Sequence, residues 1–184
     1  MHVHRFEKLW FGASLVLIVA FIGTIVYGAI GPGVAMVGDD GGTIDADVVA
    51  NGNFEQADNF REPGVYESSD GDGVDVYIVA RQYLFNPGTA QPIEVPAGEE
   101  VTFHVTSADV THGFNLAGTN VNTMVIPGQV ARFDVTFDET GEYGIVCHEY
   151  CGSGHHTMAG QLHVVPQSQF DVSANADASV EGEN

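Results

Sequence analysis

The hydrophobic positions of this chain follow two patterns, one continuous and one alternating. Residues 9–30 form the continuous pattern, with 22 residues and no charged side chain. At 1.5 Å per residue a helix of that length spans about 33 Å, which is enough to cross a bilayer once. Trp10 and Tyr27 lie near its two ends, where aromatic residues gather at membrane interfaces. The pattern therefore predicts one transmembrane helix over residues 9–30.

The charges beside this segment predict its orientation. Arg5 and Lys8 lie before it, within residues 1–8, and acidic residues follow it. The positive-inside rule then places residues 1–8 in the cytoplasm and the rest of the chain outside, anchored in the plasma membrane. A cleaved signal peptide is the alternative, but its apolar region is usually shorter and ends at a small-residue cleavage site. We therefore favour a retained single-pass anchor.

The alternating pattern begins at Val74, where the run VDVYIVA reads as a half-buried strand. Turn sequences such as NPG, PAG, IPG and DETG separate the strands that follow. Many short strands predict an all-β sandwich or barrel over residues 74–166. The predicted strands after the first are 93–95, 101–107, 113–117, 121–125, 130–137, 141–146 and 160–165.

The two segments that flank this domain lack periodicity. Residues 31–73 are rich in Gly and Asp, so we expect an acidic linker with little capacity to build a core. Residues 167–184 are expected to be a disordered acidic tail. Within the linker, a short piece has apolar side chains able to pack on the domain, namely Val48, Val49, Phe54 and Phe60.

The charge balance is extreme. The chain has 25 acidic and five basic residues, and only Arg61, Arg81 and Arg132 are basic beyond residue 30. The acids could form a docking face for a basic partner protein, or they could adapt the protein to high salt. Because they are spread over the whole domain, we favour adaptation to salt, as in a halophile. No nucleic-acid partner is expected.

The segment CHEYCGSGHHTM, residues 147–158, carries the candidate chemistry. It holds two thiols, an imidazole and a thioether, which are the soft donors that copper selects, and His112 lies 35 residues upstream. A mononuclear blue-copper site needs two His, one Cys and a weak axial Met. The second cysteine allows both thiolates to bridge two coppers, each with one terminal histidine. A thioether would then serve one copper and a backbone carbonyl between the cysteines the other, so the candidate ligands are His112, Cys147, Glu149 (main-chain oxygen), Cys151, His155 and Met158.

Three other interpretations fit the cysteines and their neighbours less well. A disulfide between Cys147 and Cys151 gives no role to the histidine and methionine at ligand spacing. A zinc site of two Cys and two His leaves Met158 idle. A thioredoxin-like copper chaperone also uses Cys-x-x-x-Cys, but there the distant histidine follows the cysteines, whereas His112 precedes them.

These residues resemble the CuA loop of cytochrome c oxidase subunit II. The resemblance runs from Val74 to Val165 and includes PIEVPAGEEVTF, DVTHGF, the IPGQ turn and GEYGIVCHEYCGSGH. The N-terminal RFEKLWF and single apolar helix resemble the single-span subunit II of B-type haem–copper oxidases. The resemblance implies a cupredoxin-like Greek-key β-barrel and the same six ligands. It also implies a haem–copper subunit I partner, which reduces oxygen to water and pumps protons, and a cytochrome c or a small blue-copper protein as electron donor.

The resemblance gives further residues a role. Glu7 matches an acid at the mouth of a proton channel, and Tyr83 and Phe85 fall in the aromatic region where electrons enter. In many relatives the Glu149 side chain helps to bind magnesium, and whether it does so here stays open. His156 neighbours a ligand, but the spacing to Cys151 favours His155. The alternative function is a membrane-anchored copper carrier that delivers metal instead of electrons.

Overall fold

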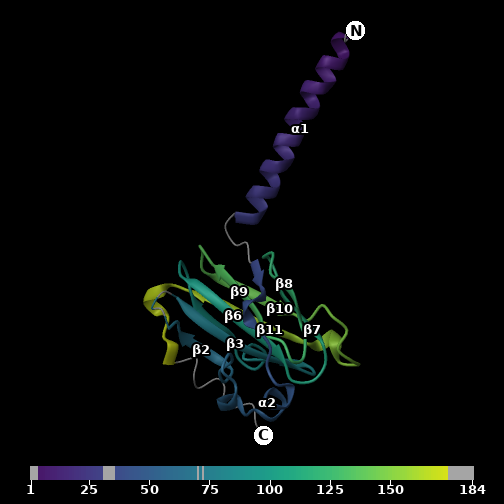
Figure 1. Ribbon diagram of the computed structural model, residues 1–184. Helices are drawn as coiled ribbons and strands as arrows, with labels where there is room; N and C mark the ends of the chain where they lie inside the picture. Colours follow the sequence, from purple (N-terminus) through teal and green to yellow (C-terminus); the bar gives the residue numbers. More distant parts are fainter. Residues whose placement is uncertain (1–3, 31–35, 70, 72, 174–184) are drawn as a thin grey trace.

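The computed structural model describes residues 4–30, 36–69, 71 and 73–173 (Figure 1). Helix α1 (Arg5–Ile30) projects from a β-rich domain. Its segment Arg5–Tyr27 is long and apolar enough to cross a membrane and is exposed along its length. The hydroxyls of Ser14 and Thr24 donate to the helix carbonyls of Trp10 and Phe21, so neither is left without a partner in an apolar surrounding. The predicted apolar helix is confirmed.

Two sheets make up the β domain. In the first, the strands lie in the order β1-β9-β6-β3-β2, and β4 pairs with the end of β3. In the second, the order is β5-β11-β10-β7-β8. The first sheet contains β1 (Met36–Gly38), β2 (Gly64–Glu67), β3 (Val74–Arg81), β4 (Leu84–Asn86), β6 (Glu100–Ser107) and β9 (Ala131–Thr136); the second contains β5 (Ile93–Pro96), β7 (His112–Leu116), β8 (Asn122–Val125), β10 (Gly141–Val146) and β11 (Ala159–Val165).

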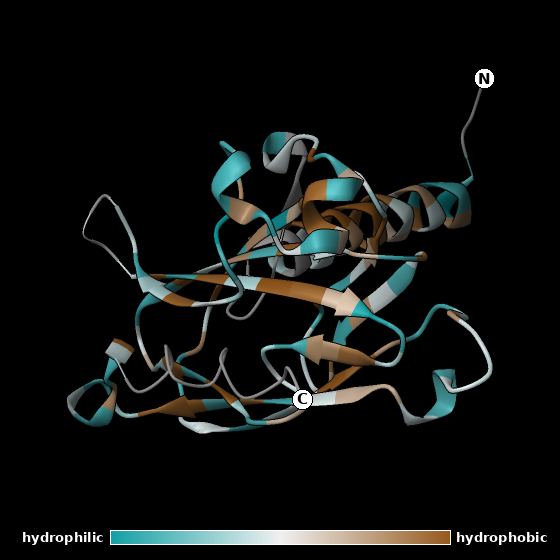
Figure 2. Cartoon of the chain, turned by 90° about the horizontal axis from the view of Figure 1, so that it is seen from below, coloured by the Kyte–Doolittle hydropathy of each residue, from teal (hydrophilic) through white to brown (hydrophobic). Residues whose placement is uncertain are grey.

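The main core lies between the two sheets. Alternate residues of β9 and β11 point inward, namely Phe133 and Val135, and Leu162 and Val164. Hydrophobic colouring runs along the strands and along α1 in Figure 2. Phe103 stacks on Phe133 at 5.1 Å between ring centroids, and Phe114 meets Phe85 edge-on at 5.7 Å. The predicted all-β sandwich is confirmed, and each of the eight strands named from the sequence lies within one residue of its predicted bounds.

The predicted linker over residues 31–73 is wrong for most of its length. Residues 36–67 contain β1, the 3-10 turns η1 (Asp39–Gly41) and η2 (Phe54–Gln56), helix α2 (Ala46–Asn51) and β2. A second core cluster lies on the outer face of β3. In this cluster Val49, Phe54 and Phe60 are buried together with Tyr77 and Val79 of the strand. Val48 is half-buried. Residues 31–35 lie outside the described residues.

The reason for this difference lies in β3, which is apolar on both faces. Val76 and Ile78 are fully buried on one face, and Val79, the next residue along the strand, is 1% exposed on the opposite face. A strand that is buried on both sides needs a cover on each, and the segment from Ile44 to Phe60 supplies the outer one. Toward the C-terminus, η4 (Gln167–Gln169) forms a 3-10 turn and Phe170 packs on the main core, so the prediction of a disordered tail is wrong for residues 167–170. Residues 174–184 lie outside the described residues.

Candidate metal centre

The predicted copper ligands come together at one end of the sandwich. His112 is the first residue of β7, and the loop 147–158 joins β10 to β11. Strands β7 and β10 pair antiparallel, with Val146 at the end of β10 opposite Asn115, so the first residues of β7 extend past the end of β10 alongside the loop. The loop closes with a hydrogen bond from the Cys147 N–H to the Met158 carbonyl at 3.4 Å. Sheet pairing therefore brings a histidine 35 residues away against the two cysteines.

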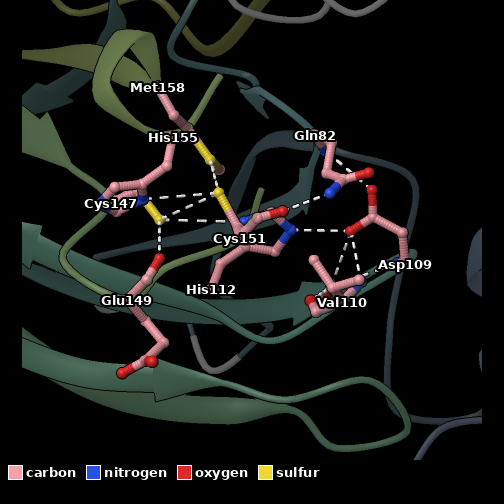
Figure 3. A network of polar contacts seen from close by, with 10 residues as sticks. Gln82, Asp109, Val110, His112, Cys147, Glu149, Cys151, His155 and Met158 are labelled. Atoms are coloured by element: carbon pink, nitrogen blue, oxygen red, sulfur yellow. Dashed lines mark hydrogen bonds and ion pairs between the residues drawn. The ribbon is translucent and has the colours of Figure 1, made fainter. Parts of the chain in front are cut away.

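The two cysteine sulfur atoms lie at the centre of the cluster (Figure 3). The Sγ atoms of Cys147 and Cys151 are 3.9 Å apart, about twice the length of a disulfide bond, and both thiols are free. Cys147 Sγ lies 3.9 Å from His112 Nδ1 and 3.2 Å from the Glu149 carbonyl oxygen. Cys151 Sγ lies 3.6 Å from His155 Nδ1 and 3.7 Å from the Met158 sulfur. Each thiol thus has its own set of neighbouring donors.

The cluster is shielded from solvent. His112 is fully buried, Met158 and the two cysteines are buried, and His155 is half-buried. Burial, with the neighbouring Cys147, raises the pKa of the Cys151 thiol to about 11. Without a metal this thiol therefore stays protonated at neutral pH. A bound cation would have to displace the proton, because a cysteine ligates as its thiolate.

Asp109 fixes the tautomer of His112. Its Oδ1 lies 2.7 Å from His112 Nε2 and accepts from the Val110 N–H at 2.6 Å, and its Oδ2 accepts from the Gln82 N–H at 2.8 Å. Burial opposes ionisation, but these hydrogen bonds outweigh it and hold the pKa of Asp109 below its usual range. A carboxylate can only accept, so His112 carries its proton on Nε2 and leaves the Nδ1 lone pair facing the sulfurs. Sequence reasoning missed Asp109, although its place three residues before a ligand is a usable signal.

The loop glycines make room for two side chains from the turn between β3 and β4. A Cβ on Gly154 would lie 2.5 Å from Cδ2 of Tyr83, and one on Gly152 would lie 2.6 Å from the Tyr83 hydroxyl and 2.7 Å from Gln82 Nε2. The Tyr83 hydroxyl lies 3.3 Å from Ser153 Oγ, and this hydrogen bond lowers the tyrosine's pKa. The Gln82 side chain donates to the Cys151 carbonyl. Nothing in the sequence of RQYLFNP indicates these contacts.

Three other residues named from the sequence are not among the donor groups of the cluster. Phe85 is 1% exposed within the main core, so its assignment to an exposed electron-entry patch is wrong: its place on β4 points it inward against Phe114. Tyr83 is half-buried and lies beside the loop. Glu7 lies in the first turn of α1, where its carboxylate accepts from the His4 N–H at 2.9 Å.

Known proteins share this domain. Residues 66–165 match the protein family described as cytochrome c oxidase subunit II, periplasmic domain. Cytochrome c oxidase subunit 2 of Thermus thermophilus is 35% identical over 166 residues, which cover 85% of this chain and 90% of the relative. The chain belongs to the cytochrome c oxidase subunit II family. A second T. thermophilus protein of that name is 47% identical over 87 residues, covering 47% of this chain and 62% of the relative.

The similarity extends to a solved structure. One chain in a cryo-EM structure of a heme-copper terminal oxidase dimer is 33% identical, with a TM-score of 0.59, and the match covers 88% of this chain and all of that chain. Members of the subunit II family are electron-transfer subunits of an oxidoreductase complex, and oxygen reduction takes place in the partner subunit I. The copper-carrier interpretation is therefore not favoured. The subunit II domain of heme-copper oxidases binds copper, and this chain has a buried group that could hold a metal ion, namely His112, Cys147 and Cys151, whose ligand atoms lie within 4.8 Å of one another.

Proposed function

We propose that this chain carries a dinuclear copper centre of the CuA type, which receives single electrons and passes them to haem in subunit I. One observation carries the proposal. Two free thiols lie side by side, and each has its own histidine and its own weaker donor within 3.9 Å. A single metal would leave part of this set unused, whereas two metals bridged by both sulfurs would use all of it. The proposed ligands are His112, Cys147, the Glu149 carbonyl, Cys151, His155 and Met158.

The donor set fits copper better than the alternatives. Two sulfurs and two imidazoles alone would also suit zinc, but the Met158 thioether lies in the same cluster, 2% exposed and in contact with Cys151. A buried thioether is a donor that Cu(I) selects and zinc does not. The separation of the cysteine sulfurs argues against a structural disulfide.

The fold holds the ligands in place and shields the site from water. His112 is held by a strand and by Asp109, and the loop is held at both ends by the pairing of β10 with β11. Burial of the thiols excludes water from their surroundings. Ligands fixed in this way move little when the charge of the centre changes. Two copper ions bound here would share one electron between them, which keeps the reorganisation on electron transfer small.

The membrane arrangement follows from α1. We propose that Arg5 and Lys8 keep residues 1–8 in the cytoplasm, so that the β domain faces the outside of the plasma membrane. A cytochrome c or a small blue-copper protein would deliver electrons near Tyr83, and electrons would leave by way of His155 toward haem.

Metal analysis of the assembled oxidase, with and without Glu149→Gln, tests whether the half-buried Glu149 side chain also binds magnesium.

Glu7 is proposed to gather protons for subunit I. The proposal rests on its place at the predicted cytoplasmic end of α1, beside Lys8. Glu7→Gln removes the titrating group while keeping the side chain's size. We expect the assembled oxidase with this change to turn over more slowly. Turnover at the wild-type rate would remove Glu7 from the pathway.

The test of the copper centre uses the full chain in mild detergent, loaded with copper after reduction of its thiols. We expect two coppers per chain and an electron paramagnetic resonance spectrum in which one unpaired electron couples equally to both nuclei. Cys151→Ser should abolish that equal coupling. His155→Ala should disrupt the spectrum, whereas the exposed neighbour His156→Ala should leave it unchanged. One copper per chain, or a blue mononuclear spectrum, would refute the proposal.

A further inference from the structure

Gln82 is not among the proposed ligands, but it makes hydrogen bonds to Asp109, which holds His112, and to the backbone of Cys151. It lies in the turn between Arg81, the last residue of β3, and Leu84, the first of β4. Its backbone N–H donates to Asp109 Oδ2 at 2.8 Å. Its side-chain amide donates to the carbonyl oxygen of Cys151 (Figure 3). One residue therefore makes two hydrogen bonds to segments that lie 27 and 69 residues away in the sequence.

The two segments carry different ligands. The first segment carries Asp109, whose other carboxylate oxygen, Oδ1, lies 2.7 Å from Nε2 of the ligand His112. The second is the loop of Cys151, which also bears His155 and Met158. An unbroken line of hydrogen bonds thus runs from the histidine of β7, through Asp109 and Gln82, to the peptide of a cysteine on the opposite side of the site.

The surroundings of the Gln82 amide hold it in this position. A side chain on Gly152 would place its Cβ 2.7 Å from the amide nitrogen, so the site is shaped to admit the amide. Tyr83, the next residue, is fixed to the same loop by its hydroxyl, 3.3 Å from Ser153 Oγ. Gln82 itself is exposed, so these contacts, and not burial, orient its amide toward the Cys151 carbonyl.

We propose that Gln82 is a positioning residue of the copper centre, which holds the His112 side and the Cys151 side at a fixed separation. It has a second effect through its charge distribution. The positive end of the amide N–H points at the peptide of Cys151, so it stabilises additional electron density on that side of the site. Gln82 therefore favours the reduced form and raises the reduction potential. This inference rests on the proposed dinuclear centre.

Two substitutions separate these effects from a general role in folding. Gln82→Met keeps the length of the side chain and the backbone bond to Asp109 but removes the amide donor. Gln82→Glu keeps the shape and replaces the donor with an acceptor that repels the Cys151 carbonyl. Gln91→Met is the matched control, since Gln91 is exposed on the turn before β5.

The measurements use the full chain in detergent, loaded with copper. For Gln82→Met we expect two coppers, a lower reduction potential, altered copper hyperfine splitting and copper release to a chelator roughly 10-fold faster than in wild type. Gln82→Glu should shift the potential further in the same direction. Gln91→Met should match wild type throughout.

The outcomes distinguish this inference from the proposed function. If the wild-type chain itself fails to bind two coppers, the proposed function fails. If it binds two and Gln82→Met has the wild-type potential, splitting and release rate, the positioning role is refuted. A Gln82→Met chain that unfolds more easily but keeps the wild-type potential and spectrum would also refute it, because that is a structural role only. Should Gln82→Met not fold, the isosteric Gln82→Glu decides by the same readouts.

Discussion

Replacing Gly154 with alanine tests whether the metal loop depends on its contact with Tyr83. Gly154 has φ −92° and ψ 7°, so its φ is negative and this backbone conformation is open to alanine as well as to glycine. The added Cβ would nevertheless lie 2.5 Å from Cδ2, 2.6 Å from Cε2 and 2.9 Å from Cγ of the Tyr83 ring. Ordinary carbon contacts lie at about 3.5–4.0 Å, so the added Cβ would be about 1 Å too close to the ring of Tyr83, which is half-buried. Either the ring or the loop must move.

The magnitude follows from two opposing effects. Forcing an extra methyl group into a packed site costs about 1–3 kcal/mol. Alanine in place of glycine also lowers the entropy of the unfolded chain, which stabilises by about 0.4–1 kcal/mol. A double-mutant cycle with Tyr83→Ala isolates the overlap, because the entropic effect is the same in both backgrounds. We expect Gly154→Ala to be more costly by about 1–3 kcal/mol when Tyr83 is present than when it is absent.

Denaturant unfolding of the four copper-free chains, followed by circular dichroism, measures these free energies. Gly144→Ala is the control, since its Cβ would meet only the Cβ of Ala117 at 3.9 Å, an ordinary contact. Because the loop carries His155 and Met158, Gly154→Ala should also speed copper release from the loaded chain. Equal costs of Gly154→Ala in the two backgrounds would refute the contact and with it the account of why glycine stands at position 154.

Three further predictions test other parts of the molecule. Phe60→Ala should lower the free energy of unfolding by about 3–5 kcal/mol, because Phe60 is 2% exposed and meets Tyr77 edge-on at 5.2 Å; a loss below about 1 kcal/mol would mean that this segment is a loose linker after all. Burial lowers the pKa of His104 below its usual 6.5 despite the hydrogen bond to Asp75, so the unfolded chain binds the proton more readily. The unfolding free energy should therefore fall as the pH drops through 6.5 toward the folded pKa, and His104→Gln should flatten that fall in a urea titration at several pH values; an unchanged slope would contradict this. Met158→Leu should keep two coppers but alter the reduction potential, since the axial ligand tunes it, and an unaltered potential in voltammetry would count against Met158 as a ligand.

The local features of this protein could be predicted from the sequence. The apolar helix, the positions of eight strands and the spacing of the ligand loop all rest on periodicity or on residues close in the chain. Those patterns arise because a helix or a strand repeats its exposure every few residues, whatever lies opposite it. The halophile interpretation of the acidic composition stays a prediction, since it concerns the environment of the protein and not its fold.

The sequence misled where the partner of a segment lay far away. The residues before Val74 look like a linker by composition, yet four spaced apolar side chains suffice to cover the outer face of β3. Three of the four side chains named from the sequence as able to pack on the domain, Val49, Phe54 and Phe60, do cover Tyr77 and Val79, but the local pattern did not show that they pack on the outer face of β3. Phe85 likewise looked like a surface aromatic and is a core residue.

Residue identity alone specifies which donor atoms are available for the metals. Two thiols, two imidazoles and a thioether are fixed by residue identity, and copper selects them whatever the fold. How those donors are held depends instead on the packing of segments that lie far apart in the chain. The line from His112 through Asp109 and Gln82 to Cys151 joins three segments that meet because two sheets pack face to face. Hydrogen bonds between distant segments leave no periodic trace in a sequence, because their geometry exists only after the chain has folded.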